Sequence, residues 1–237
     1  MGIFKSLFGK SSPADYNITG LPYATEQELL EAFGGIGLDK QRDLHELIGE
    51  SNWNIDIPKG EITFGSVTLP VQVLGSFSRS SETWLWGWAN TQTDIPPKHL
   101  VQAKALQDFG TQKKIDLLDM PQYKAEINDL HRIGMIASGI FDSGAYYLAD
   151  YGEGVLLVTL EFDTKTLDSA AEQLRILSVF PQLISLFDLN HRTALQSYLE
   201  HKGYSLTADE ASVTATKNGQ QITAAFDSQS RMTQLNG

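Results

Sequence analysis

Cysteine is absent from the 237 residues of this chain, and basic residues are few. Without cysteine there is no disulfide framework, no cysteine-ligated zinc or iron–sulfur cluster and no thiolate nucleophile. The chain has 18 Lys and Arg against 29 Asp and Glu, which gives a formal net charge of −11. Because nucleic-acid binding needs a basic surface to neutralise phosphates, we expect no nucleic-acid partner.

Long apolar runs are also missing. The longest candidates, Val155–Leu160 and Ile133–Phe141, are much shorter than the run of about 18 residues that predicts a membrane span. The apolar part of the N-terminus is too small for a secretory signal, so a cytoplasmic location is the default expectation.

The first ten residues allow two interpretations. They begin with Met1-Gly2 and carry a serine at position 6, which fits the loose pattern for N-myristoylation, and their apolar residues share helical spacing. One interpretation is therefore a membrane-surface adaptor that binds through residues 1–10. The other, which we favour because so short a helix holds a membrane weakly, is a frayed or self-docked N-terminal turn.

Apolar periodicity and capping residues predict helices and strands in two successive groups. The expected helices cover residues 25–33, 39–48, 98–109, 125–136, 168–179 with a continuation beyond Pro181, and 191–201. The expected strands cover residues 53–57, 61–64, 67–74, 83–89, 145–151, 154–162, 212–217, 221–226 and 231–235. Asn218-Gly219 is a strong hairpin signature between two of them.

This order predicts an α+β fold with mainly antiparallel sheets, in which each run of strands is preceded by helices. We expect an N-terminal arm over residues 1–20 and an α+β domain over residues 21–164. Helices followed by a small antiparallel β-meander should occupy residues 165–237, packed on the first domain or continuous with it.

Three of the four tryptophans lie on one expected strand, at positions 84, 86 and 88. Alternate residues of a strand share a face at about 7 Å spacing, so the three rings could form a platform that stacks a planar or sugar-like ligand. The alternative is a core strand in which each ring is buried. The candidate ligand-binding residues are Trp84, Trp86, Trp88, Asn90, Tyr146 and Tyr147.

The segment GSFSRSSETWLWGWAN, residues 75–90, resembles a bacterial domain-of-unknown-function family marked by a T-W-x-W-x-W-A-N strand. Residues 53–64, the pair Tyr146-Tyr147 and the tail from Phe226-Asp227 to Arg231 also fit that family. The resemblance extends over most of residues 20–237. It implies a small soluble bacterial protein with a shared fold, and it implies no catalytic residues.

Complete catalytic motifs are lacking. His45-Glu46 starts like the zinc motif HExxH, but Gly49 occupies the position of the second histidine. The glycine-rich phosphate loop, the dinucleotide fingerprint and the G-x-S-x-G elbow are incomplete or absent. His131, near Glu126 and Asp129, is the best candidate for acid–base chemistry, against the simpler interpretation of a solvated helix face. We therefore expect no metal site and no cofactor, and we assign no catalytic residue.

These observations favour a non-catalytic binding or protein-interaction module with an aromatic-lined groove. Its partner would be a protein or a small molecule, and the sequence leaves homo-oligomerisation open. A hydrolase-like enzyme that uses carboxylates and His131 is one alternative. The membrane-surface adaptor is the other.

Overall fold

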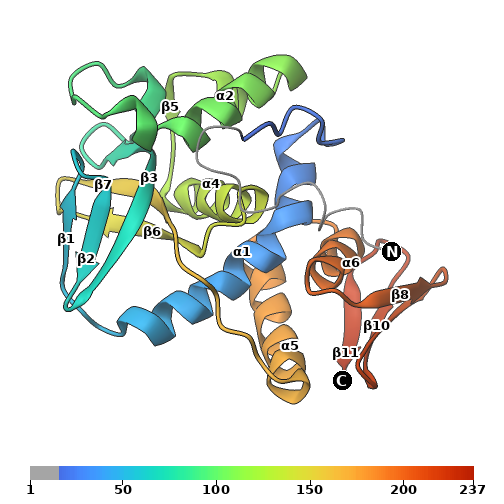
Figure 1. The fold of residues 1–237 in the computed structure, drawn as a ribbon. Coiled ribbons are helices and arrows are strands. Elements are labelled where there is room, and N and C mark those ends of the chain that lie inside the picture. The colour runs from blue at the N-terminus through green and yellow to red at the C-terminus, as the bar shows by residue number, and fades with distance from the viewer. Residues whose placement is uncertain (1–15) are drawn as a thin grey trace.

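Two antiparallel sheets and the helices packed on them make up the computed structural model, which describes residues 16–237 (Figure 1). The α-helices are α1 (Glu26–Ile48), α2 (Val101–Lys113), α3 (Asp116–Asp119), α4 (Ile127–Ile140), α5 (Ser169–Leu186) and α6 (His191–His201). Two 3-10 helices are η2 (Gly87–Ala89) and η3 (Pro97–His99). The predicted α+β fold with antiparallel sheets is confirmed, whereas the apolar stripe of residues 1–10 lies outside the described residues.

The larger sheet has seven strands arranged around β3. Its strands are β1 (Trp53–Asp56), β2 (Glu61–Phe64), β3 (Val67–Ser78), β4 (Thr83–Trp86), β5 (Gln122–Lys124), β6 (Ala145–Asp150) and β7 (Gly154–Leu160). The start of β3 pairs with β2, and the end of β3 pairs with β4. Strand β7 pairs with β3 along most of the length of β3. The long strand β3 therefore joins the tryptophan-bearing strand β4 to the rest of the sheet.

Helix α1 crosses the middle of the molecule, with the larger sheet on one side and α5, α6 and the smaller sheet on the other (Figure 1). The sequence predicts two helices here, separated at Gly34-Gly35, but α1 runs through these glycines without a break. Their small size explains the difference. A Cβ atom on Gly35 would lie 2.6 Å from the Cβ of Tyr198, and one on Gly37 would lie 2.5 Å from the Met135 carbonyl oxygen. The glycines let α6 and α4 approach α1 closely.

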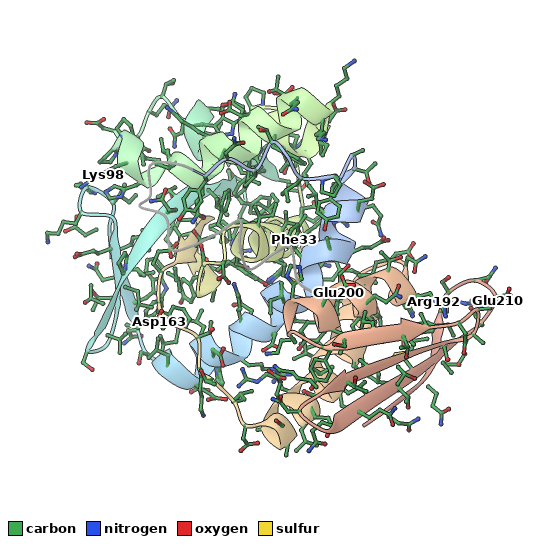
Figure 2. All side chains as sticks on the ribbon, turned by 45° about the vertical axis from the view of Figure 1, so that its right-hand side comes forward. Phe33, Lys98, Asp163, Arg192, Glu200 and Glu210 are labelled. Carbon is green, nitrogen blue, oxygen red and sulfur yellow. The ribbon has the colours of Figure 1, made fainter. Side chains whose placement is uncertain are left out.

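Phe33 marks the centre of the core, where Figure 2 shows it between the two halves of the molecule. Its ring lies 5.3 Å from that of His201 on α6, and a Cβ atom on Gly139 of α4 would meet its side chain at 2.7 Å. One continuous cluster of buried apolar side chains extends from Trp84 of the larger sheet to Phe226 of the smaller one. The parts before and after the boundary expected at residues 164/165 therefore share one apolar core. The division into two domains stays a prediction.

The smaller sheet is a four-stranded meander at the C-terminal end. Its strands are β8 (Ser205–Ala208), β9 (Ser212–Lys217), β10 (Gln220–Phe226) and β11 (Met232–Asn236). Alternate residues such as Val213, Ala215 and Ile222 are buried, and α5 and α6 contact the sheet. Asn218 and Gly219 both have positive φ values, of 49° and 81°, as the predicted hairpin turn requires.

Several boundaries differ from the sequence predictions. Helix α5 continues through Pro181 to Leu186, although a proline inside a helix removes one backbone hydrogen bond and crowds the preceding turn. The short strands β5 and β8 and the single-turn helix α3 were not predicted, since three or four residues carry too little periodicity. Among residues 16–237, no helix combines the length and apolar character that crossing a membrane requires.

Candidate functional site

Trp84 and Trp86 are completely buried. Their rings pack edge to face, with centroids 5.3 Å apart, and the Trp86 indole N–H donates a hydrogen bond to the Leu117 carbonyl at 3.1 Å. Trp84 Nε1 has no hydrogen-bond partner within the described residues. Both side chains act as core residues and offer no surface to a ligand in this structure.

Trp88 does not continue the tryptophan face, because β4 ends at Trp86 and the chain turns into η2. The turn places Gly87 so close to its surroundings that a Cβ atom there would lie 2.8 Å from Leu100 Cδ2. Trp88 is half-buried. The side-chain Oδ1 atom of the half-exposed Asn90 accepts hydrogen bonds from the backbone N–H groups of Gln92 and Thr93. Ligand binding at Trp88 and Asn90 stays a prediction.

The two tyrosines of β6 point to different sides of the larger sheet. Tyr146 is buried in the same apolar cluster as Trp84 and Trp86, and burial raises the pKa of its hydroxyl. Tyr147 packs in a second cluster, where its ring contacts those of Trp53 and Phe64 at 6.3 and 4.8 Å. The structure therefore does not bring the six predicted residues together around one groove.

His131 lies beside a tyrosine and not beside a carboxylate. Its Nδ1 atom is 2.9 Å from the Tyr146 hydroxyl, and burial lowers the pKa of the imidazole. The nearby carboxylates of Glu126 and Asp129 form the capping box at the start of α4. The hydrogen bond to a carboxylate that a hydrolase mechanism would need at His131 is not formed.

A buried serine belongs to a network of polar side chains. The Ser143 hydroxyl donates to the Glu161 carboxylate at 2.9 Å and accepts from Gln102 at 3.0 Å. Gln102 in turn accepts the Thr159 hydroxyl at 2.6 Å. These groups satisfy one another, as buried polar groups do in a stable core. In residues 16–237, no three His, Asp or Glu side chains are grouped so that they could hold a metal ion.

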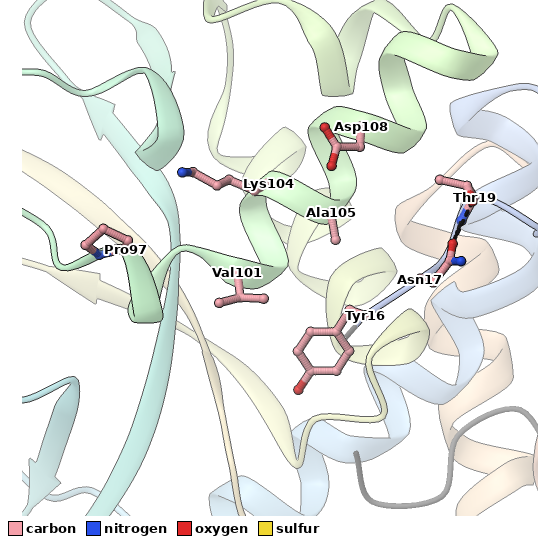
Figure 3. A pocket seen from close by; sticks show the side chains of 8 residues that line it. All are labelled: Tyr16, Asn17, Thr19, Pro97, Val101, Lys104, Ala105 and Asp108. Atoms are coloured by element: carbon pink, nitrogen blue, oxygen red, sulfur yellow. Dashed lines mark hydrogen bonds between the residues drawn. The ribbon is translucent and has the colours of Figure 1, made fainter. Parts of the chain in front are cut away.

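One cavity, of ≈ 390 Å³, lies between α2 and the segment just before α1 (Figure 3). It is lined by Tyr16, Asn17, Thr19, Pro97, Val101, Lys104, Ala105 and Asp108. Tyr16 is its only aromatic residue, so it differs from the predicted aromatic groove. Sequence analysis missed it because its two walls lie about eighty residues apart in the chain.

Buried charges join α1 to α5 and α6. The Asp39 carboxylate of α1 accepts a hydrogen bond from the Tyr198 hydroxyl at 2.6 Å and lies 3.0 Å from the Lys202 ammonium. Burial raises the pKa of Tyr198 well above its usual value, so that the hydroxyl stays protonated and donates to Asp39. One turn further along α1, Asp43 pairs with Arg175 of α5. The C-terminal helices are thus held on α1 by charges as well as by apolar contacts.

Helix α5 has its charged side chains turned inward. Glu172 and Arg175 are its only charged residues, and their side chains are 12% and 9% exposed. Glu172 pairs with Lys217 of β9 at 2.7 Å, and Arg175 pairs with α1. Leu174, by contrast, is 68% exposed. An ordinary surface helix has the opposite arrangement, with charges outside and leucines inside.

The side of α5 that faces away from the core has no charge along its whole length. We call it the α5 outer face; its residues are Ala170, Leu174, Leu177, Ser178, Pro181, Gln182 and Ser185. Leu177 and Pro181 are partly exposed, and the other five are exposed. The Ser178 and Ser185 hydroxyls donate to the carbonyls of Arg175 and Gln182 in the same helix. Because these two hydroxyls are bonded within the helix, they depend little on water for hydrogen bonds.

Sequence analysis missed the α5 outer face, although the sequence contains a usable sign of it. Residues 169–186 carry only two charges, fewer than is typical of a helix that faces water. We interpreted these residues only as a helix with an interruption at Pro181. Exposure of the apolar residues, which distinguishes a surface from a core, became visible only in three dimensions.

Comparison with known protein families gives a match to part of the chain. Residues 27–161, more than half of the chain, match a family described as a family of unknown function (DUF6882). The expected membership of a family of unknown function is confirmed, although the match is shorter than residues 20–237 and leaves out α5, α6 and the smaller sheet. No curated protein matches the chain. No solved structure matches it either.

Proposed function

Because the chain belongs to a family of unknown function (DUF6882), whose description assigns no activity, we propose from its structure that it is a non-catalytic protein-interaction module. Its docking surface is the α5 outer face. The observation that carries the proposal is the inversion of α5, in which both charges are buried and Leu174 is 68% exposed.

Exposing this face to water has a cost in free energy. Burying one leucine side chain stabilises a protein by about 1.5–3 kcal/mol, and the outer face leaves Leu174 largely in water. Leu186, at the end of the same helix but outside this face, is also 52% exposed. Extended apolar surface on an otherwise charged protein typically marks an interaction site. A partner that covers α5 recovers this free energy.

The chemistry of the face favours another protein as the partner over nucleic acid or an anionic membrane. Nucleic acids and anionic lipid headgroups are bound by Lys and Arg, and the α5 outer face has neither. An uncharged helix or strand with small and branched apolar side chains complements it, because no charge is then buried without a counter-charge.

The other functions considered have less support. A hydrolase would need a carboxylate at His131, where the Tyr146 hydroxyl is found instead. An aromatic groove would need exposed rings at Trp84 and Trp86, which are buried. The membrane-surface adaptor depends on residues 1–10, outside the described part of the chain.

Site-specific photo-cross-linking tests the proposal. A benzophenone amino acid is placed at position 174 in cells that produce the protein naturally, and at position 47 as the control. Leu47 is an exposed leucine of α1, outside the α5 outer face, with 42% exposure. We expect one discrete adduct at position 174 that mass spectrometry maps to an apolar segment of a single protein. No adduct above the control, or scattered adducts to many proteins, would contradict the proposal.

A further inference from the structure

We infer that the partner covering the α5 outer face is a second copy of this chain, bound with the two α5 helices antiparallel. The inference rests on the proposed function and names its partner. It requires that the face be complementary to itself, that two acidic molecules can meet there, and that the contact be apolar enough to be stable.

Six of the seven outer-face residues are placed symmetrically along the helix, and the counterpart of the seventh, Gln182, is the half-buried Gln173. Ala170 and Ser185, Leu174 and Pro181, and Leu177 and Ser178 form three pairs equally spaced about the midpoint between residues 177 and 178. In a two-fold dimer the same patch serves both subunits, and residue i contacts j while j contacts i. A two-fold axis through this midpoint places each member of a pair opposite the other member in the second copy.

Side-chain size supports close contact along this axis. Small residues stand at both ends of the face, Ala170 and Ser185, and Ser178 stands at its centre. Leu174 and Leu177 lie between them and can enter the spaces that the small residues leave on the other helix. The antiparallel arrangement also brings the positive end of one helix dipole beside the negative end of the other.

Charge favours this face over the rest of the surface. Each chain carries a formal net charge of −11, so two copies repel each other where acidic side chains meet. Helix α5 itself brings no charged side chain into the contact, because Glu172 and Arg175 are paired in the interior. The charge at its edge is the Arg42 guanidinium of α1, which donates to Gln182 at 2.9 Å and adds no acidic group to the contact.

The smaller sheet offers a second uncharged surface, which serves as the competing hypothesis. Thr207, Thr214 and Thr223 are aligned across its outward side by the strand register. Threonine hydroxyls that face water keep their hydration, and little apolar area would be buried there. The α5 outer face therefore has the larger driving force.

The molar mass in solution is the first test, measured by light scattering over a dilution series. We expect the wild-type chain to reach about twice its 26.2 kDa mass at high concentration. Leu174→Glu should weaken dimerisation at least about 100-fold, because each copy loses a buried leucine and gains a charge in the contact. Leu47→Glu, which adds the same charge at an exposed leucine of α1, should leave the dimer intact.

Disulfide trapping tests the geometry, and the absence of cysteine makes its result unambiguous. A single introduced cysteine can form a disulfide only with another copy. Under mild oxidation Ser178→Cys, beside the proposed two-fold axis, should give a covalent dimer. Thr214→Cys, on the outward side of the smaller sheet, should not.

The outcomes separate this inference from the proposed function. A wild-type chain that stays monomeric, or a dimer that Leu174→Glu leaves intact, overturns the second copy as the partner. Trapping at Thr214 alone overturns it as well. If the chain is monomeric but position 174 still cross-links to one other protein, the dimer is overturned and the proposed interaction function stands. A monomer with no cross-link overturns both.

Discussion

Two tryptophans that are equally buried differ in one hydrogen bond. Trp86 donates its indole N–H to the Leu117 carbonyl, whereas Trp84 Nε1 has no partner among residues 16–237. A buried donor without a partner costs free energy, and a satisfied one contributes modestly to stability. The two rings therefore contribute equally to stability through apolar burial. The indole N–H of Trp86 adds to stability, whereas that of Trp84 reduces it.

Replacing each ring with phenylalanine tests this difference. Trp86→Phe should lower the free energy of unfolding by about 1–2 kcal/mol more than Trp84→Phe, because only Trp86→Phe removes a hydrogen bond. Urea unfolding followed by far-UV circular dichroism measures both values. Trp84→Phe is the matched control, since it removes the same atoms. Equal losses in the two variants would contradict the assigned role of Trp86.

At the scale of elements, the sequence predicted which segments are helices or strands better than it predicted where each one begins and ends. Helix α6 (His191–His201) has the predicted bounds, because Asn190 caps its start and Gly203 follows its end. The break expected at Gly34-Gly35 was wrong, because the close approach of Tyr198 to Gly35 depends on α6, about 160 residues further along the chain. The burial of Trp84 and the exposure of Leu174 depend in the same way on distant elements. Local patterns contain no information on such contacts.

The ionic contacts between α1 and α5 lead to a prediction at this scale. Arg175→Met should lower the free energy of unfolding by about 3–5 kcal/mol, because it leaves Asp43 buried without a counter-charge and removes a cation beside Asp39. Arg79→Met is the control, since the Arg79 and Asp150 side chains are 44% and 51% exposed and their pair should contribute at most about 1 kcal/mol. Chemical denaturation measures both. A loss at Arg175 no larger than that at Arg79 would show that the buried pairs contribute little.

The whole molecule is expected to unfold as one unit. The apolar cluster that includes Trp84 and Phe226 is shared by both sheets, and α1 contacts α4 on one side and α5 and α6 on the other. Neither part can therefore lose its structure without exposing the core of the other.

Two optical probes can test this cooperativity at one protein concentration. All four tryptophans lie at positions 53–88, so their fluorescence reports only on the part that contains the larger sheet. Far-UV circular dichroism reports on the helices and strands of both parts. We expect the two urea transitions to coincide. Two separated transitions would instead support independent domains with a boundary at residues 164/165.

The charge pairs of α1 also have an evolutionary consequence. Asp39 and Asp43 lie within the stretch that matches the family, whereas Arg175 and Lys202, which neutralise them, lie beyond its end at Glu161. A gene shortened after that point would encode two stranded carboxylates on α1. Loss of the C-terminal part and replacement of these two aspartates should therefore have occurred together in any lineage that dispensed with it.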